Sequence, residues 1–375
     1  MAALDDLVAD VRALVECESP SDDLAAVARS AEVVTRLGTA RLGVAPERIV
    51  LDGRTHLRWR LGAAPSRVLI VGHHDTVWPL GSLADHPCTV EDGVLRGPGC
   101  FDMKAGLVMA FHAAAGLDGV TLLVTGDEEL GSPTSRELIE AEARTATAAL
   151  VLEASAAGGA VKTERKGTSM YEVRVVGRAA HAGLEPERGV NASVELAHQV
   201  LAVSALADPA AGTTVTPTAA RAGTTTNTVP AAGSFQVDVR ATTLAEQARV
   251  DRAIHALSPV LPGARLEVIG EPNRPPLEAT ASAALFERLC RVAARMGLPE
   301  PACAAVGGAS DGNFTAGAGT PTLDGLGAVG GGAHAADEHV LVDELPGRTA
   351  LLRALVEELL ADPTNPVTGS GAARP

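Results

Sequence analysis

Three near-continuous apolar runs, each ending in acidic or histidine side chains, constrain the fold of this chain most strongly. They are RVLIVGHHD (67–75), VTLLVTGDEE (120–129) and AALVLEAS (148–155). Runs of this kind are typical of strands that are buried on both faces of a parallel sheet. The segments 102–117 and 132–144, which lie between the runs, have helical periodicity. This alternation predicts an α/β fold with a doubly wound, mostly parallel sheet.

The pattern changes between residues 167 and 275, where we expect an inserted domain. Its expected elements follow the order βαββαβ, which is the order of a ferredoxin-like domain. They are strands at 169–177, 213–223, 233–241 and 264–270, and helices at 190–206 and 244–257. The Pro-rich stretch 271–279 suits a linker that leads back into the first domain. The first domain would then consist of residues 1–166 and 276–375.

Composition excludes several classes of partner and location. The formal net charge of −15 argues against a general affinity for nucleic acid or for anionic membranes. The five cysteines are scattered, with no CxxC pair, which is typical of reduced thiols in the cytoplasm. The N-terminus carries acids where a signal peptide needs basic residues, and no apolar run approaches the roughly 20 residues that span a bilayer. We therefore expect a cytoplasmic protein.

Side chains that bind metals stand at the ends of all three apolar runs and near the start of the helix that follows the first run. His73 and Asp75 are two residues apart, so they project to the same side of an extended segment. Several acids at one sheet edge would repel each other unless cations lay between them. Imidazole and carboxylate groups bind zinc, and carboxylates can bridge two ions about 3.5–4 Å apart. The side chains concerned are His73, Asp75, Asp102, Glu128, Glu129 and Glu153.

Taken singly, each of these features has a simpler interpretation. The histidine and aspartate of the first run can be a hydrogen-bonded pair, and the DEE run at 127–129 can be a solvated loop. Asp102 can be a helix cap without any metal. Their joint occurrence at strand ends along one edge of a sheet favours a metal centre.

Six ordered motifs resemble those of a zinc metallopeptidase family. The motifs are VGHHDTV, GPGCFDMKAG, TGDEELGS, GRAAHAGLEPERGVNA, TTTNTVP and GGAHAADEHV, and they extend from residue 67 to about 340. The family includes glutamate carboxypeptidase, aminoacylase, acetylornithine deacetylase and succinyl-diaminopimelate desuccinylase, and the chain is most similar to the glutamate carboxypeptidase branch. The resemblance implies that residues 167–275 form a lid and dimerisation domain, and that the rest forms a zinc-binding catalytic domain.

The resemblance also implies a role for each matched residue of the first domain. Asp102 would bridge two zinc ions, with His73 and Glu153 completing one set of ligands and Glu129 and His334 the other. Cobalt and manganese accept the same ligand types. Glu128 would be the general base that deprotonates a metal-bridging water. Asp75 would orient the imidazole of His73, whereas His74 would be a packed or surface residue.

In the second domain the resemblance implies that side chains contact the substrate. His181 would donate to the oxyanion, and it and Asn227 would come from the partner subunit of a homodimer. Arg274 would bind a substrate carboxylate. Ser310 and Asn313, in the loop at 307–315, would be donors at the substrate site, although a plain strand-to-helix turn is the alternative.

The expected reaction is the hydrolysis of an amide bond next to a free carboxylate. The substrate would be a peptide with a C-terminal, glutamate-like residue or an N-acyl amino acid. Alternatives are a biosynthetic deacylase that acts on acetylornithine or succinyl-diaminopimelate, and a relative that binds metal without catalysis. Three residues have no assigned role. Cys100 is interpreted as packing; Arg165 and Lys166 could reach the site or be solvated residues of a hinge, and we favour the latter.

Overall fold

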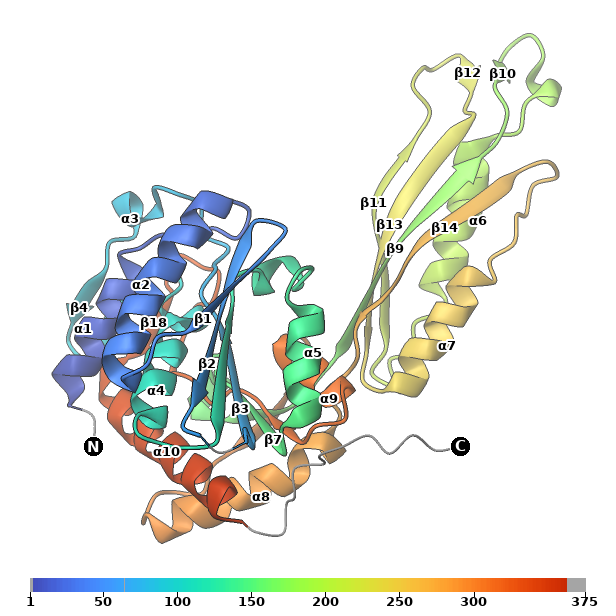
Figure 1. Ribbon diagram of the computed structural model, residues 1–375. Coiled ribbons are helices and arrows are strands. Elements are labelled where there is room, and N and C mark those ends of the chain that lie inside the picture. The colour runs from blue at the N-terminus through green and yellow to red at the C-terminus, as the bar shows by residue number, and fades with distance from the viewer. Residues whose placement is uncertain (1–2, 64, 363–375) are drawn as a thin grey trace. The chain divides into compact units, whose positions relative to one another are not determined.

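The computed structural model describes residues 3–63 and 65–362 (Figure 1). The chain divides into two compact units, and each is considered by itself. Unit 1 comprises the described parts of Met1–Glu164, Glu278–Val306 and Ser310–Pro375, and unit 2 comprises Arg165–Leu277 and Gly307–Ala309.

A six-stranded sheet with the order β1-β2-β6-β3-β7-β16 forms the centre of unit 1. Its strands are β1 (Glu47–Leu51), β2 (Arg54–Leu61), β3 (Val68–His73), β6 (Val120–Thr125), β7 (Ala148–Val151) and β16 (Thr322–Leu323). The three predicted apolar runs are the neighbours β6, β3 and β7, which pair in parallel, as β16 does with β7. The hairpin of β1 and β2 joins β6 in antiparallel pairing. The expected α/β class is confirmed.

Helices cover both faces of this sheet. They are α1 (Leu4–Val15), α2 (Leu24–Leu42), α4 (Ala105–Ala114), α5 (Arg136–Thr145), α8 (Ala279–Arg295), α9 (Asp311–Gly317) and α10 (Leu345–Ala361). The short helix α3 (Ser82–Asp85) lies in the connection that follows β3. Alternate residues of β3 face opposite sides: Ile70 belongs to the core that includes α1, α2 and α4, whereas Leu69 packs with Ile139 of α5 and Phe314 of α9. Successive side chains of a strand point to opposite faces of the sheet, and here both faces are covered by apolar cores. This explains why the sequence of β3 is apolar without interruption.

A second, four-stranded sheet in unit 1 brings a late segment of the chain beside an early one. Its order is β17-β18-β5-β4, with β4 (Thr89–Glu91), β5 (Val94–Arg96), β17 (Gly330–Gly331) and β18 (His339–Leu341). β18 pairs with β5 in antiparallel fashion, so that residues 331–339 lie next to the loop that follows β5. A separate pair joins β8 (Val161–Arg165) to β15 (Cys303–Val306).

Unit 2 contains a four-stranded antiparallel sheet with the order β11-β13-β9-β14. In chain order its elements are β9 (Gly167–Val176), α6 (Ala192–Ser204), β11 (Thr214–Ala222), β13 (Ala232–Ala241), α7 (Leu244–His255) and β14 (Arg265–Arg274). Val173, Phe235 and Val237 of the sheet share one core with Val203 of α6 and Val250 of α7. The short strands β10 (Ala180–His181) and β12 (Thr228–Val229) pair with each other.

The predicted linker at 271–279 was wrong over its first four residues. β14 continues through Pro272 and ends at Arg274, with an irregular register between those two residues. Proline is tolerated there because β14 is an edge strand, whose outward N–H groups need no partner in the sheet.

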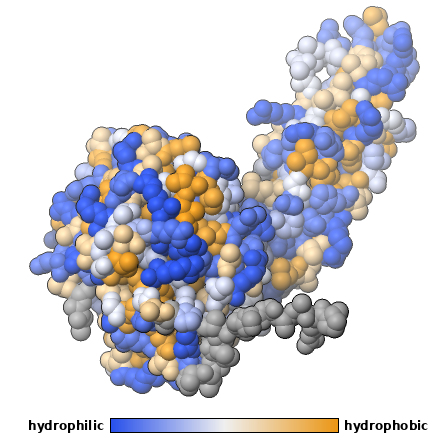
Figure 2. All heavy atoms as spheres, viewed as in Figure 1, coloured by the Kyte–Doolittle hydropathy of each residue, from blue (hydrophilic) through white to orange (hydrophobic). Residues whose placement is uncertain are grey.

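The surface mixes hydrophilic and apolar residues on both units (Figure 2). None of the helices in the described residues is long and apolar enough to span a membrane. All five cysteines are free thiols. Cys100 lies in the main core of unit 1, which agrees with its interpretation as a packing residue.

Candidate metal centre

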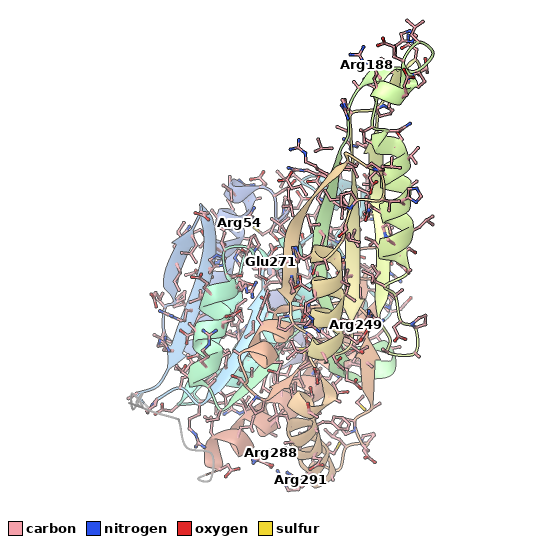
Figure 3. All side chains as sticks on the ribbon, turned by 90° about the vertical axis from the view of Figure 1, so that its right-hand side faces the viewer. Arg54, Arg188, Arg249, Glu271, Arg288 and Arg291 are labelled. Atoms are coloured by element: carbon pink, nitrogen blue, oxygen red, sulfur yellow. The ribbon has the colours of Figure 1, made fainter. Side chains whose placement is uncertain are left out.

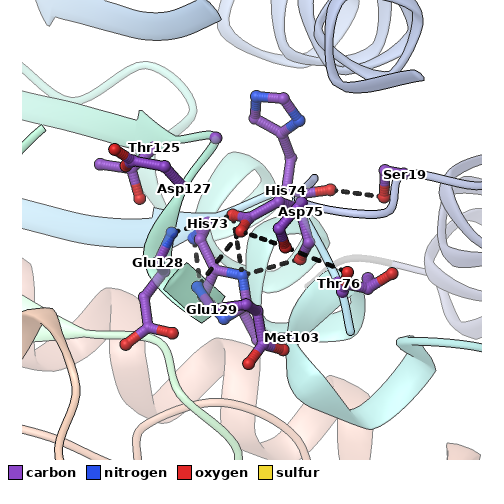
Figure 4. Close-up of polar contacts among 12 residues, drawn as sticks. Ser19, His73, His74, Asp75, Thr76, Met103, Thr125, Asp127, Glu128 and Glu129 are labelled. Atoms are coloured by element: carbon purple, nitrogen blue, oxygen red, sulfur yellow. Dashed lines mark hydrogen bonds and ion pairs between the residues drawn. The ribbon is translucent and has the colours of Figure 1, made fainter. Parts of the chain in front are cut away.

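The predicted ligands of unit 1 converge at one edge of the parallel sheet. Figure 4 shows two of them, His73 and Glu129. His73 is the last residue of β3, and Glu153 follows β7 by two residues. Glu128 and Glu129 lie in a short 3-10 turn, Glu128–Leu130, because β6 ends at Thr125 and not at the acids themselves. Asp102 lies in the turn Cys100–Lys104, immediately before α4. Neighbouring parallel strands therefore deliver these side chains to one place.

Each carboxylate oxygen of Asp102 faces a different histidine. Oδ1 lies 3.3 Å from Nε2 of His73, and Oδ2 lies 3.2 Å from Nε2 of His334. His73 Nε2 is also 3.5 Å from Oε1 of Glu153, and His334 Nε2 is 3.3 Å from Oε1 of Glu129. The five side chains thus form two sets that share Asp102.

The chemistry of these side chains fits cations. Ligand atoms of His73, Asp102 and Glu129 lie within 4.8 Å of one another, as do those of His73, Glu128 and Glu153. Nε2 of His73 and Oε1 of Glu129 are buried and make no hydrogen bond within residues 3–63 and 65–362. Buried polar atoms without a partner are costly, and a cation held between the imidazoles and carboxylates would satisfy them.

The electrostatics of the cluster also favour positive charge. Burial opposes ionisation of Asp102, but the contacts with His334 and His73 outweigh it and hold the pKa of Asp102 well below its usual value. The contacts with Asp102 and Glu129 raise the pKa of His334 to about 10. The pKa of His73 is raised as well: burial lowers it, and contacts with Asp102, Asp75 and Glu153 more than compensate. Both histidines therefore respond to a strongly negative local potential.

Asp75 fixes the turn that carries the two glutamates. Its carboxylate accepts hydrogen bonds from the backbone N–H groups of Glu128 and Glu129, both at 3.2 Å (Figure 4). It also accepts one from the hydroxyl of Ser21 at 2.7 Å. The imidazole of His73 is oriented mainly by the backbone carbonyl of Asp75, which lies 2.9 Å from Nδ1, whereas the Asp75 carboxylate is 3.5 Å away. This bond directs Nε2 of His73 toward the other ligands.

His74 is a packed residue, as expected. It is buried, with Nδ1 at 3.1 Å from the hydroxyl of Ser30 and Nε2 at 3.0 Å from the carbonyl of Thr55. Burial lowers the pKa of His74 to about 4. It is therefore a neutral structural residue beside the site.

Two buried aspartates that we did not predict from the sequence stabilise the segments on either side of the turn Glu128–Leu130. Asp127 accepts hydrogen bonds from the backbone and hydroxyl groups of Thr134 and Ser135. Asp311 accepts from the hydroxyl of Thr125 at 3.1 Å and from that of Ser132. Asp127 stands next to Glu128 in the DEE run, but no feature of the sequence indicated its partners.

Glu338 is a third buried acid that was missed. Its carboxylate accepts hydrogen bonds from the backbone N–H groups of Gly99 at 2.9 Å, Phe101 at 2.9 Å and Asp102 at 3.0 Å. The indole N–H of Trp78 donates to it at 2.7 Å. The position of Glu338, four residues after His334 in the same motif, was the only available signal.

Within unit 2 the structure places Asn227 immediately before β12, the strand that pairs with the strand of His181. His181 of β10 pairs with Thr228 of β12, and the N–H of Ala182 donates to the carbonyl of Asn227 at 2.9 Å. His181 is exposed, and its Nδ1 accepts hydrogen bonds from the N–H groups that follow it at residues 183 and 184, both at 3.1 Å. An accepting Nδ1 places the proton of the neutral ring on Nε2, which makes Nε2 a donor.

The described contacts of Ser310 and Asn313 are those of a helix cap. Both are fully buried, and each bonds to the backbone at the first turn of α9 in a capping box. Ser310 also donates to Asp324 at 2.5 Å. These contacts correspond to the plain strand-to-helix turn that was the alternative for this loop.

Arg274 and Arg165 are both buried in unit 2, at the end of β14 and at the start of the unit, respectively. The guanidinium of Arg165 donates to the carbonyl of Gly308 at 3.1 Å, and Lys166 donates to the carbonyl of Gly212 at 2.5 Å. The interpretation of Arg165 as a solvated residue was therefore wrong, because its side chain is only 4% exposed and binds a backbone carbonyl.

Histidines and carboxylates gathered at the carboxyl edge of a parallel α/β sheet are the side chains that a metal-dependent enzyme needs. The sequence profile of Peptidase family M20/M25/M40 matches residues 69–358, and the chain belongs to this family. It is a hydrolytic enzyme of the metallopeptidase class.

Three known proteins illustrate the similarity. Carboxypeptidase G2 of Pseudomonas sp. (strain RS-16) is 31% identical over 293 residues, which cover 74% of this chain and 70% of the relative. Succinyl-diaminopimelate desuccinylase of Roseobacter denitrificans is 29% identical over 306 residues, which cover 73% of this chain and 76% of the relative. The crystal structure of aminopeptidase PepT from Bacillus cereus superimposes with a TM-score of 0.73 at 22% identity, covering 96% of this chain and 99% of the other.

Proposed function

We propose that this chain is a two-metal hydrolase that cleaves an amide bond next to a free carboxylate. The observation that carries the proposal is the position of Asp102, whose two oxygens face different histidines at 3.3 and 3.2 Å. Asp102 would contribute to holding both ions, His73 and Glu153 would help to hold one, and Glu129 and His334 would help to hold the other. Zinc is the proposed metal, and cobalt or manganese would accept the same ligands.

The side chains around the ligands would perform the proton transfers. When bound, the two cations polarise the amide carbonyl and lower the pKa of water. Glu128 lies close to two proposed ligands, since its carboxylate is within 4.8 Å of ligand atoms of His73 and Glu153. It would take the proton from water and pass it to the leaving amine. Asp75 would keep Glu128 in place, because it accepts the backbone N–H groups of the turn.

Unit 2 would supply the groups that recognise the substrate. We propose that it is a lid of the ferredoxin-like type, which its strand order supports. The Nε2 proton of His181 would be donated to the oxyanion, with Asn227 nearby, directly before the adjacent strand β12. Arg274 would bind the free carboxylate of the substrate through its planar fork. We retain the proposal that His181 and Asn227 act across a homodimer, and that the enzyme works in the cytoplasm.

The proposed substrate is a peptide with a C-terminal glutamate-like residue or an N-acyl amino acid. The similarity to a carboxypeptidase at 31% identity supports this class. The second candidate is a biosynthetic deacylase, which the similarity to a desuccinylase at 29% identity favours. Hydrolysis of N-acyl glutamates and dipeptides, compared with that of acetylornithine and succinyl-diaminopimelate, separates the two.

The general test is Glu128→Gln in the enzyme loaded with zinc. The amide cannot take a proton, so kcat should fall by roughly 10²- to 10⁴-fold while two ions per chain remain bound. Glu137→Gln, an exposed position on α5, is the matched control and should leave kcat unchanged. An unaltered kcat in Glu128→Gln would exclude the proposed base, and less than one ion per chain in the wild-type protein would exclude the metal centre.

A further inference from the structure

The carboxylate of Glu338 connects three segments that carry proposed metal ligands. It accepts the N–H groups of Gly99, Phe101 and Asp102 from the loop before α4. It also accepts the indole N–H of Trp78, three residues after Asp75. Glu338 itself follows His334 in the segment between β17 and β18.

The four hydrogen bonds of Glu338 are buried, since the residue is only 3% exposed. Oε1 accepts from the N–H groups of Phe101 and Asp102, and Oε2 accepts from those of Gly99 and Trp78. A carboxylate is an acceptor at both oxygens, so it can satisfy all four N–H groups at once. No neutral side chain of the same length offers two equivalent acceptors.

The loop that Glu338 holds has no helical geometry of its own at the critical position. Asp102 has φ −115° and ψ 94°, so its N–H does not continue the turn, and this N–H is donated to Glu338. The same residue has both side-chain oxygens within 3.3 Å of the histidine nitrogens. A shift of this backbone would move both oxygens relative to both histidines.

We infer that Glu338 is a positioning residue of the metal centre, which holds the backbone of Asp102 so that its carboxylate spans two cations. The inference rests on the proposed two-metal function. It assigns to Glu338 a role in metal affinity that acts through Asp102, without contact between Glu338 and the ions. Partners of metal ligands that lie one step away commonly change metal affinity by about 10- to 100-fold when they are replaced.

Glu338→Gln tests this inference. Glutamine keeps the length of the side chain, but its NH₂ group cannot accept, so two of the four N–H groups lose their partner. We expect the affinity for zinc, measured by competition with a chromogenic chelator, to fall by about 10- to 100-fold. The absorption spectrum of the cobalt-loaded protein should change as well, because the geometry around the ions is altered.

Glu142→Gln is the matched control. Glu142 on α5 is also buried, and it binds Arg58 at 2.6 Å and Arg60 at 2.8 Å, away from the segments that carry the ligands. It should lower the thermal stability of the metal-free protein without changing zinc affinity or the cobalt spectrum. If Glu338→Gln behaves in the same way, with lower stability and unchanged affinity, the inference is overturned.

A milder variant covers the case in which Glu338→Gln does not fold. Trp78→Phe removes one donor and leaves the three backbone bonds in place, so zinc affinity should fall by a smaller factor than in Glu338→Gln, about threefold or more, below the range of about 10- to 100-fold. Unchanged affinity in Trp78→Phe would then overturn the inference. Absence of zinc binding by the wild-type protein would refute the two-metal function itself, which is a different outcome.

Discussion

Oδ2 of Asp102 and Nε2 of His334 lie 3.2 Å apart, although the two residues come from distant parts of the sequence. The pairing of β18 with β5 brings their segments together. His334 has φ 62°, a left-handed conformation that is uncommon for a residue other than glycine and that the surrounding structure must maintain. The second half of the proposed metal centre therefore depends on this small sheet.

Replacing His334 with Ala should weaken one of the two proposed ion positions and leave the other. The imidazole is the only histidine ligand proposed for the ion shared with Glu129, whereas His73 and Glu153 keep their places. We expect the metal content to fall from two ions to about one per chain, with a loss of kcat of at least about 10²-fold. Elemental analysis after dialysis measures the metal content. His339→Ala, in the same segment, should retain two ions; equal losses in both variants would contradict the assignment.

Gly106→Ala should destabilise unit 1. A Cβ on Gly106 would lie 2.1 Å from the carbonyl oxygen of Leu152, a backbone atom next to Glu153. Because a backbone must move to accommodate it, we expect the free energy of unfolding to fall by about 1–3 kcal/mol. Urea denaturation measures this. Gly347→Ala, where a Cβ meets nothing within 4 Å, should change stability by no more than about 1 kcal/mol.

Arg274→Lys should raise KM and change kcat little. Lysine keeps the charge but lacks the two parallel donors that match a carboxylate. The substrate and the transition state are then bound more weakly to the same extent, which raises KM and leaves kcat nearly unchanged. We expect kcat/KM to fall by about 10- to 100-fold, from steady-state kinetics with an N-acyl glutamate. Arg265→Lys, an exposed position at the other end of β14, is the control. A drop in kcat at constant KM would argue against a role in binding.

Glu246 should contribute stability that is lost in acid. Arg249 lies on α7 (Figure 3). Hydrogen bonds from Arg249 and from Thr213 lower the pKa of Glu246 from 4.5 to about 2. Since the folded pKa is the lower one, the contribution is complete above pH 4.5 and disappears as the pH falls toward 2. The difference in unfolding free energy between wild type and Glu246→Gln should therefore shrink from pH 6 to pH 3. A difference that stays constant or grows in acid would contradict this.

The sequence indicated the parallel strands and the residues at their ends because both depend on local pattern. A strand buried on both faces must be apolar throughout, and polar residues can return only where it ends, as at His73 and Glu153. The order of elements in unit 2 was predictable for the same reason. The extent of β14 could not be predicted, because a strand tolerates Pro272 only if it lies at the edge of the sheet, as β14 does.

Contacts between distant segments could only be decided by the tertiary structure. The sequence by itself determined the class of fold and the family, and it predicted the ligand side chains, because these follow from periodicity and motif. It could not determine that Asp75 and Glu338 bind backbone N–H groups of the loops that bear the proposed ligands, or that Ser310 and Asn313 cap a helix. A buried carboxylate needs donors, but which N–H groups supply them is settled only when the chain folds and brings those loops together.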